Sequence, residues 1–529
     1  MLTLKVFFKD KLELINYCYY SKKKKKIKKK EKKENMFGYF LLKTEIYMII
    51  QIVILLFFSI ILQEKVINLK YKLNILHIIQ FFACLILFYS ILILYNSIFY
   101  DAILLNYQII CDNLSFFFKF ILLLTSFICI LFSWSYCDYE NIKVFEYIIL
   151  LLLSVVGMLT IVSSYDLITM YLAIELQSLC FYVVTNLKFY SNFSIEAGLK
   201  YFILGALSSG ILLFGCSLLY GSTGLTNFLD LKTLFYYYSM SNYNLYYYTC
   251  SLIGLIFIYC GILFKIGVVP FHMWVSDIYE GSPTNITFFF AVVPQISIIS
   301  LLLRLNIIFL DAYMKYLYIF FLSLSILSIL VGTFGAIYQT KLKRILAYSS
   351  INNIGYVLSG FLTVDVEGMY SVIFYMIIYN IISIGLWILL LNLRNQSNLV
   401  KLKEIGDLVL LFKSNKYLSI IFFIFLFSGM GIPPMVGFYS KLFILLNIIE
   451  LKMYFFALFL IIMNSISVIY YLRLIKIMFS LNTDKSIFIV DIGEITALIL
   501  LILVYINIFF FFFPNYMIII LHNFILLLV

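Results

Sequence analysis

The sequence predicts an all-α polytopic membrane protein with about 14 transmembrane helices. The chain of 529 residues is 64% hydrophobic and only 12% charged, and its mean hydropathy is +1.05. Soluble domains are about 45–50% apolar and about 25% charged. Its apolar runs reach roughly 20 residues, the length of a spanning helix, whereas barrel strands alternate over roughly 10 residues. Helices also satisfy their own backbone groups in lipid.

The predicted spans follow one another along the chain at 46–63, 75–98, 115–134, 144–164, 167–187, 199–220, 250–275, 284–304, 316–338, 343–362, 369–392, 417–450, 453–479 and 492–513. Window 417–450 is too long for one simple span and contains "GMGIPPMVGF", which predicts a broken helix. Small residues in "GALSSG" (205–210) and at Gly215 predict a close packing face on the sixth span. The tail from Pro514 is expected along the surface.

Charge is unevenly distributed. Residues 1–35 carry 13 lysines and 4 acidic residues, which is +9 of the net charge of +12. A block of like charges predicts a solvated tail; docking to acidic lipids or an acidic partner is the alternative. No nucleic-acid partner is expected. The odd-numbered loops hold 16 lysines and arginines and the even-numbered loops hold 4, so the odd loops should face the matrix or cytoplasm. Both termini are then predicted on the opposite side.

Cofactor chemistry finds no support in the sequence. The nine cysteines occur singly, there are three histidines, and no CxxC pair, GxGxxG or Walker motif occurs. No metal, haem or iron–sulfur ligand set can be built at recognisable spacing. We therefore expect no metal and no bound cofactor on this chain.

The stretch "LFKIGVVPFHMW" (263–274) interrupts the seventh span. Pro270 has no N–H, so the carbonyl of Ile266 loses its helical partner. Lys265 lies beside that carbonyl, where a charged amine costs roughly 2.5–3.5 kcal/mol. A wet helix break lowers this cost, so the break and the lysine together predict a polar site. A lysine that snorkels from a helix end is the alternative.

A second break is predicted in the twelfth span. Pro433 and Pro434 free the carbonyls of Gly429 and Met430, and Lys441 follows. An end-of-helix lysine is the alternative. Broken helices at corresponding positions are typical of transporter repeats. The offset of five spans predicts two inverted five-helix repeats, spans 4–8 and 9–13.

Glu175, in "YLAIELQSLCFY", supplies a possible counter-charge in the fifth span. A buried carboxylate and a buried lysine keep each other charged when close, and tend to become neutral when they separate. Glu175 and Lys265 would then form a proton switch; a static ion pair is the alternative. Lys200, at the start of the sixth span, is another candidate partner of Glu175, or a helix-end anchor.

Four further polar residues lie near these breaks or in the eighth span. His272 follows the first break and is either a proton carrier or a hydrogen-bonded packing residue. Asp277 and Glu280 in "DIYEGSP" are predicted to be solvated loop acids. Gln295 in the eighth span is a neutral hydrogen-bonding residue.

Several long blocks carry a family resemblance: "YLAIELQSLCFYV", "EAGLKYFILGALSSGILLFGCSLLYGSTG", "GILFKIGVVPFHMWVSDIYEGSPT", "LKRILAYSSINNIGYVLSG" and "GIPPMVGFYSKLFIL". Over roughly residues 145–480 the chain resembles the subunit 2 (subunit N) family of NADH:ubiquinone oxidoreductase, complex I. The resemblance implies a fourteen-helix antiporter-like membrane-arm subunit with broken helices 7 and 12.

The resemblance also implies site residues. The family's proton path uses a helix-5 glutamate and lysines in helices 7, 8 and 12. Three of these fall on Glu175, Lys265 and Lys441, whereas Gln295 stands where the family has the helix-8 lysine. Glutamine cannot take up and release a proton, so the relay must use water or a neighbour such as His272 there, or not run.

The expected function follows from these residues and the resemblance: proton translocation in the mitochondrial inner membrane, with both termini in the intermembrane space. FMN, iron–sulfur clusters and ubiquinone would lie on other subunits. Expected partners are other membrane-arm subunits and lipids, with cardiolipin a candidate. The alternatives are a subunit of a sodium/proton antiporter and a structural spacer with a decayed channel. The predicted segments are a lysine-rich extension (1–45), three first helices (46–143), two repeats (144–304 and 305–480) and a C-terminal part (481–529).

Overall fold

The computed structural model describes residues 42–68, 75–96, 102–140, 145–188, 191–240, 245–363, 366–394, 402–409, 411–479 and 493–526. The lysine-rich extension lies outside the described residues. The all-α polytopic prediction is confirmed. The helices are α2 (Lys43–Asn68), α3 (Ile75–Tyr95), α4 (Asn113–Tyr139), α5 (Glu146–Ser163), α6 (Leu167–Thr185), α7 (Asn192–Thr223), α8 (Phe228–Met240), α9 (Leu245–Ile266), α10 (Met273–Gly281), α11 (Thr284–Ile337), α12 (Leu342–Gly360), α13 (Val366–Asn392), α14 (Leu411–Ser414), α15 (Lys416–Met430), α16 (Gly437–Glu450), α17 (Tyr454–Phe479), α18 (Glu494–Phe512) and α19 (Pro514–Leu526), with a 3₁₀ turn at Ile405–Leu408.

Within the described ranges, twelve helical segments are long and apolar enough to cross a membrane. Two other predicted spans are helical but differ in character. The twelfth is divided into α15 and α16, as the proline pair predicts. The tenth, α12, is almost entirely buried and carries serine and asparagine side chains in the protein interior. The number of crossings and the inverted repeats stay predictions.

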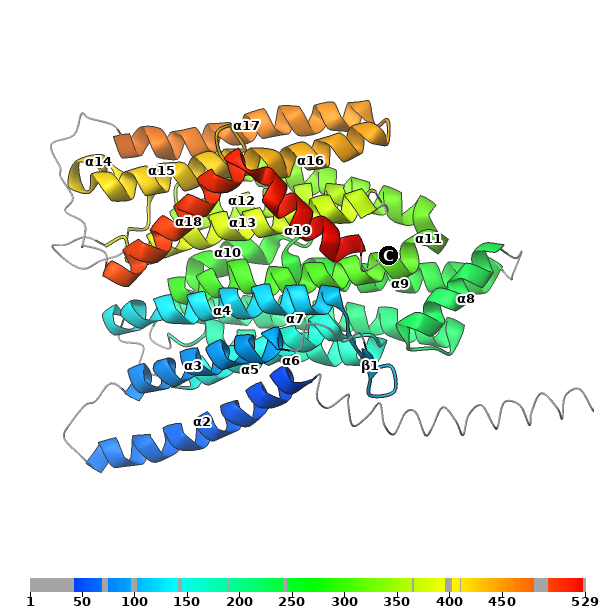
Figure 1. Ribbon diagram of the computed structural model, residues 1–529, viewed down its shortest axis with the longest axis horizontal. Coiled ribbons are helices and arrows are strands. Elements are labelled where there is room, and N and C mark those ends of the chain that lie inside the picture. Colours follow the sequence, from blue (N-terminus) through cyan, green and yellow to red (C-terminus); the bar gives the residue numbers. More distant parts are fainter. Residues whose placement is uncertain are drawn as a thin grey trace, which may run out of the picture.

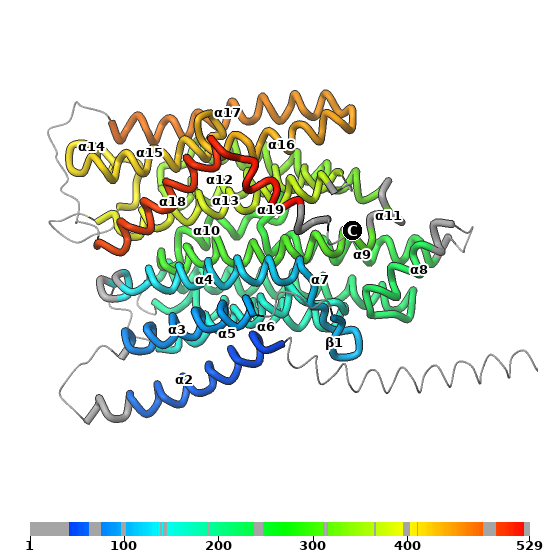
Figure 2. Tube along the Cα trace, in the orientation of Figure 1, coloured from blue at the N-terminus to red at the C-terminus, as the bar shows by residue number. Residues whose placement is uncertain are grey.

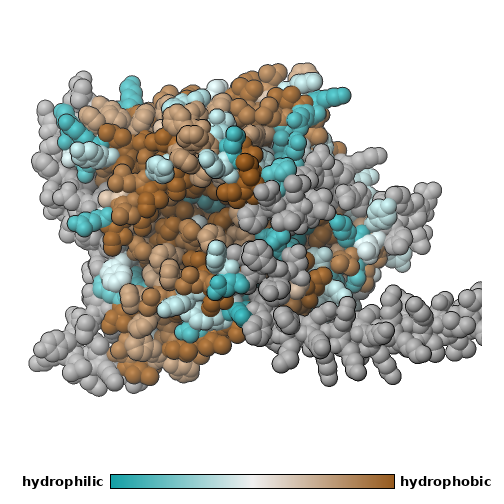
Figure 3. All heavy atoms as spheres, in the orientation of Figure 1, coloured by the Kyte–Doolittle hydropathy of each residue, from teal (hydrophilic) through white to brown (hydrophobic). Residues whose placement is uncertain are grey.

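The helices lie side by side in one bundle, with α2 at one edge and α17 at the other (Figures 1 and 2). The closest packing is between α7 and α9, α11 and α12, and α5 and α6. Hydrophobic residues cover much of the visible face in Figure 3, as a lipid environment requires. Polar helix α12 lies inside, packed against α10, α11, α13 and α16.

The small residues of α7 do form a close packing face. A Cβ at Gly215 would lie 2.8 Å from the Gly254 carbonyl oxygen on α9, and a Cβ at Gly205 would overlap the Tyr182 hydroxyl on α6. Any larger residue at these two glycines would push the helices apart. This packing brings α6, α7 and α9 together around the first helix break.

Two features of the connections were not predicted. The predicted spans 284–304 and 316–338 correspond to two apolar helical segments, Thr284–Phe309 and Tyr316–Ile337, which meet within α11 at a kink where Tyr313 leaves helical geometry (φ −117°, ψ 19°). The sequence also gave no sign of α8, which is too short to span a membrane. It forms because Phe228, Leu231 and Phe235 are fully buried, and it packs against α11.

A cap of short segments covers one end of the bundle. Strands β1 (Ala102–Leu104) and β2 (Ile109–Cys111) form an antiparallel hairpin, and single bridges join Ile109 to Ser164 and Asp166 to Asn227. These residues belong to the even-numbered loops, so the cap lies at the end predicted to face away from the matrix. The tail beyond Pro514 is helix α19, which packs against α13.

Candidate functional site

The first helix break lies between Ile266 at the end of α9 and Met273 at the start of α10. The indole N–H of Trp274 donates to the carbonyl of Phe264 at 2.9 Å. The backbone N–H of Gly267 donates to the same carbonyl at 3.0 Å. Since the Phe264 carbonyl has these two donors, it does not need Lys265 as a cap.

Lys265 instead points toward α6. Its Nζ donates to the Tyr182 hydroxyl at 3.4 Å and lies 5.8 Å from the centre of that ring. Glu175 is electrostatically coupled to Lys265, but no ion pair joins them within 4.0 Å in the part of the chain that the structure describes. The Glu175 carboxylate accepts only a long bond from Ser178 at 3.4 Å, and its Oε1 is buried without a hydrogen-bond partner.

A small cavity lies beside Lys265. It measures about 20 Å³ and is lined by residues of α6, α7, α9, α10 and α11, among them Ser178, Lys265 and Pro294, but not by Glu175. A site of this size holds about one water molecule when polar groups line it. Lys265 therefore has room for a water molecule beside it, and the expected Glu175–Lys265 switch stays a prediction.

The second break places Lys441 more tightly. Its Nζ donates to the carbonyls of Gly429 at 3.1 Å and Met430 at 2.8 Å, and to Oδ1 of Asn464 at 2.7 Å. The two carbonyls are those that Pro433 and Pro434 were predicted to free. Lys441 is only 6% exposed, so the alternative of an end-of-helix lysine in water is wrong.

Gly431 allows this arrangement for two reasons. It has the left-handed φ of +74° that ends α15. A Cβ at this position would also lie 2.6 Å from Cδ of Lys441. The lysine thus folds back over a bare backbone to reach the carbonyls of the preceding helix end.

Gln295 is buried in α11 with its Oε1 lacking a hydrogen-bond partner. The Tyr379 hydroxyl on α13 lies close enough to interact with the side chains of Gln295 and Ser350, and Tyr279 interacts with the same serine. Tyrosine and serine hydroxyls both donate and accept hydrogen bonds. Gln295, which stands where the family has the helix-8 lysine, therefore lies beside a set of hydroxyl groups.

More polar groups on α12 continue from Ser350 toward the second break. Tyr375 donates to Oδ1 of Asn353 at 2.9 Å, and Tyr471 of α17 interacts with the Asn353 and Ser349 side chains. A Cβ at Gly429 would lie 3.3 Å from the Tyr471 hydroxyl, so Tyr471 reaches the helix end that Lys441 binds. Buried polar groups thus extend from the Gln295 region to Lys441, with gaps that water can bridge.

The other candidate residues lie at the end of the bundle opposite the cap. Lys200 is 44% exposed and pairs with Glu196 at 2.7 Å and Asp277 at 3.2 Å, rather than with Glu175. The prediction of solvated loop acids is wrong, because Asp277 and Glu280 lie in α10.

These α10 acids form ion pairs with α12. Arg344 bonds to Asp277 at 3.3 Å and to Glu280, and Lys341 also pairs with Glu280. The local sequence around the two acids could not reveal these partners, because the basic residues of α12 are distant in the chain. His272 is half-buried at the break, directly before α10.

Residues 164–467, more than half of the chain, match the family described as NADH:quinone oxidoreductase/Mrp antiporter, transmembrane. The chain belongs to this family. It is 46% identical to NADH-ubiquinone oxidoreductase chain 2 of Marchantia polymorpha over 353 residues, 66% of this chain and 70% of that protein. It is 41% identical to NADH-quinone oxidoreductase subunit N of Pelagibacter ubique over 380 residues, 70% of this chain and 78% of the relative. The resemblance seen in the sequence is confirmed.

Solved structures of distant relatives share the fold. A chain of respiratory complex I from Thermus thermophilus superposes with a TM-score of 0.71 at 22% identity, covering 88% of this chain and 98% of that one. A chain of the Mrp complex from Dietzia sp. DQ12-45-1b gives a TM-score of 0.74 at 17% identity, covering 92% and 97%. At these identities the family fold is shared, and function has to be argued from the site.

Proposed function

We propose that this chain translocates protons as a membrane-arm subunit of respiratory complex I. Electron transfer from NADH to ubiquinone takes place on other subunits, to which we assign the FMN, the iron–sulfur clusters and the ubiquinone. The chain's part is to move protons when the redox reaction changes its conformation or its electrostatic field. Its named relatives are complex I subunits from plant mitochondria and bacteria.

One observation carries the proposal: each of the two helix breaks holds one lysine that is withdrawn from the surface. Lys265 lies half-buried at the α9–α10 break, and Lys441 lies buried at the α15–α16 break. Ionisable side chains inside membrane bundles mark ion and proton pathways, since charge is costly there. Lysine suits the role because it changes its protonation state readily when buried.

The energies involved are of a suitable size. Moving one proton against the membrane potential costs about 2.3 kcal/mol per 100 mV. A change of one unit in a group's pKa corresponds to about 1.36 kcal/mol. A change in the separation of Glu175 and Lys265 supplies energy on this scale.

Near Gln295, protons move through neighbouring hydroxyl groups and not through the glutamine side chain. Tyr379 and Ser350 lie beside the glutamine, and the polar groups of α12 lead on to Lys441. A hydroxyl accepts one proton as it donates another, which an amide does not do. This arrangement argues against the spacer alternative, for which the missing lysine was the main support.

The chain is a multi-pass mitochondrial membrane protein, like its plant relatives. We place it in the inner membrane with both termini in the intermembrane space, from its distribution of lysine and arginine. Other subunits of complex I are its partners. The exposed apolar helices are covered by such subunits and by lipid, and cardiolipin is a candidate.

Substitution of Lys265 in the intact complex tests the function. In Lys265→Met, reconstituted into vesicles, NADH-driven acidification should fall at an unchanged amount of assembled complex. The matched control is Lys416→Met, which removes an exposed lysine at the start of α15. Normal acidification by the Lys265 variant would refute a proton-carrying role for the first break.

A sodium/proton antiporter subunit is the second candidate, because the matched family includes Mrp antiporters and an Mrp chain shares the fold. The two functions differ in the redox partners. Purification of the native assembly in mild detergent should recover flavin and NADH oxidation together with this chain. An assembly without either, with transport that depends on sodium, would favour the antiporter.

A further inference from the structure

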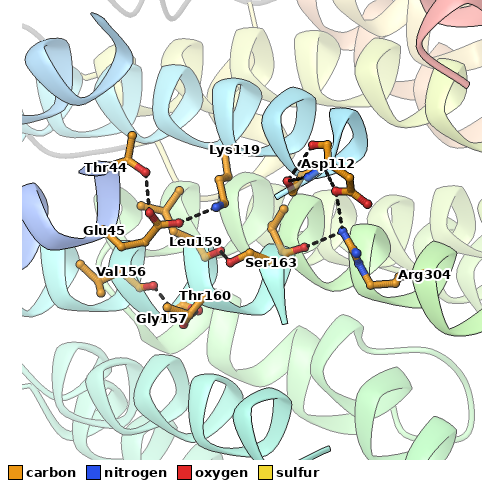
Figure 4. Close-up of polar contacts among 12 residues, drawn as sticks. Thr44, Glu45, Asp112, Lys119, Val156, Gly157, Leu159, Thr160, Ser163 and Arg304 are labelled. Carbon is orange, nitrogen blue, oxygen red and sulfur yellow. Dashed lines mark hydrogen bonds and ion pairs between the residues drawn. The ribbon is translucent and has the colours of Figure 1, made fainter. Parts of the chain in front are cut away.

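A second pair of buried charges lies far from both helix breaks, near the capped end of the bundle. Nζ of Lys119 on α4 lies 2.5 Å from Oε1 of Glu45 on α2, and the two side chains are 2% and 5% exposed. The hydroxyl of Thr44 donates to the other carboxylate oxygen at 2.6 Å. Figure 4 shows the lysine and the glutamate pointing at each other between α4 and α2. The ion pair was not predicted from the sequence, and Glu45 was predicted to belong to the lysine-rich extension (1–45).

A neighbouring pair lies at the same end of α4. Nη2 of Arg304 on α11 bonds to Oδ1 of Asp112 at 3.0 Å and to the carbonyl of Val162 at 3.3 Å (Figure 4). The same Asp112 oxygen accepts the backbone N–H of Ser115 at 2.9 Å, which caps α4. Burial raises the pKa of Asp112, but the Arg304 charge together with hydrogen bonds from Arg304 and Ser115 outweighs burial and holds the pKa of this carboxyl below its usual value.

The two pairs differ in what they can do chemically. An arginine does not lose its proton in a protein, so Asp112 and Arg304 remain a fixed ion pair. Lysine can lose its proton when buried, and glutamate can gain one. Lys119 and Glu45 are therefore the pair that can exist both as two ions and as two neutral groups.

Few other titratable groups face this pair. Cys111 from β2 and Asp112 at the start of α4 interact electrostatically with Lys119, and Arg304 acts on the same cysteine and aspartate. The fixed Asp112–Arg304 pair contributes little net charge. Among its titratable neighbours, Glu45 therefore has the strongest electrostatic effect on Lys119.

The position of the pair indicates the side of the membrane to which it would release protons. Glu45 is in the first turn of α2, and Lys119 is about 10 Å along α4 from Asn113 at a rise of roughly 1.5 Å per residue. Both helices begin at the end of the bundle that carries the cap. The loop charges predict that this end faces away from the matrix, the side to which a proton pump delivers.

We propose that Glu45 and Lys119 form a proton-release site at the capped end of the bundle. The inference rests on the proposed function, because protons must first reach this end through the interior. The ammonium of Lys119 passes its proton to the Glu45 carboxylate, which leaves a neutral amine and a carboxylic acid. The acid gives the proton to water at the membrane face, and the amine takes the next proton from water inside the bundle. Charge and protons balance over the cycle.

A static lock that holds α2 to the bundle is the competing explanation. The lock and the release site differ in what substitution does. A buried ion pair can often be replaced by uncharged residues without loss of stability. Replacement of a proton carrier by such residues stops proton transfer. The test measures protons moved per NADH oxidised in the intact complex, with the amount of assembled complex measured separately. The variants are Lys119→Arg and the double variant Glu45→Gln with Lys119→Gln.

Both variants should assemble, oxidise NADH and move fewer protons per NADH. Lys119→Arg keeps the ion pair but holds its proton, so it isolates proton release from attachment of α2. The control is Asp112→Asn with Arg304→Gln, which keeps an N-cap for α4 and should leave the proton ratio unchanged. Normal ratios in both test variants would overturn the release site and identify a lock. Lys265→Met in the same assay separates the two proposals: a loss there, beside normal test variants, leaves the proposed function standing.

Discussion

The backbone carbonyls at the two helix breaks receive their hydrogen bonds from different donors. At the first, Trp274 and the backbone N–H of Gly267 both donate to the carbonyl of Phe264, and Lys265 extends toward Tyr182 and Glu175. At the second, Lys441 itself binds the carbonyls of Gly429 and Met430. Lys265 is thus coupled to a carboxylate, whereas Lys441 is bound to backbone and to Asn464. The same residue type serves as a switch partner at one break and as a helix cap at the other.

Lys441→Met should have the largest effect. Two buried carbonyls lose their donor, at about 1–3 kcal/mol for each unsatisfied group, and the relay loses a proton carrier. We expect lower amounts of assembled complex and little proton transport by what remains, measured by native electrophoresis and vesicle acidification. Normal assembly would show that Lys441 is not the cap.

Lys441→Arg sharpens this test, since arginine donates to both carbonyls but keeps its proton. Assembly should recover relative to the methionine variant while proton transport stays low. Recovery of both properties would mean that Lys441 has only a structural role.

Trp274→Phe should have the next largest effect, at the first break. The indole donor is lost and the Phe264 carbonyl keeps only the N–H of Gly267 at 3.0 Å, so the cost is that of one hydrogen bond, about 0.5–1.5 kcal/mol. The thermal midpoint of the purified complex should fall, while proton transport falls less than in Lys265→Met. A loss of transport equal to that of Lys265→Met would contradict the division of roles between these two residues.

Tyr379→Phe tests the path between the breaks. The variant removes one hydroxyl beside Gln295 and little volume, so assembly should be unchanged and proton transport reduced. Adding Gln295→Lys should restore transport, because a lysine at that position supplies a carrier of its own. Full transport in Tyr379→Phe alone would exclude the tyrosine from the path.

Lys200→Met should have the smallest effect. Lys200 is 44% exposed, and its pairs with Glu196 and Asp277 are surface ion pairs, which contribute little to stability. Stability and transport should both stay near those of the unchanged chain. A strong loss of transport would assign Lys200 to the entry of the proton path.

The sequence was most informative where backbone chemistry leaves few choices. Pro433 and Pro434 identified in advance the carbonyls that Lys441 binds, because a proline removes a known hydrogen bond. Hydropathy located most of the spans for a similar reason, since lipid demands long apolar helices.

Contacts between distant segments could not be predicted in this way. Lys119 contacts Glu45, and Arg304 contacts Asp112, only after the bundle has formed. The spacing of these residues in the sequence predicts neither pair. A partial signal was present for the path along α12. Polar "SSINN" (349–353) inside a spanning window indicates a helix that faces protein rather than lipid.

The central claim is that Lys265 and Lys441, the lysines at the two helix breaks, carry protons. It is tested most directly by the number of protons moved per NADH oxidised, measured on reconstituted complexes that contain Lys265→Met or Lys441→Arg and oxidise NADH. We predict that the ratio falls in both variants and stays normal in Lys416→Met. An unchanged ratio in both lysine variants would contradict the account.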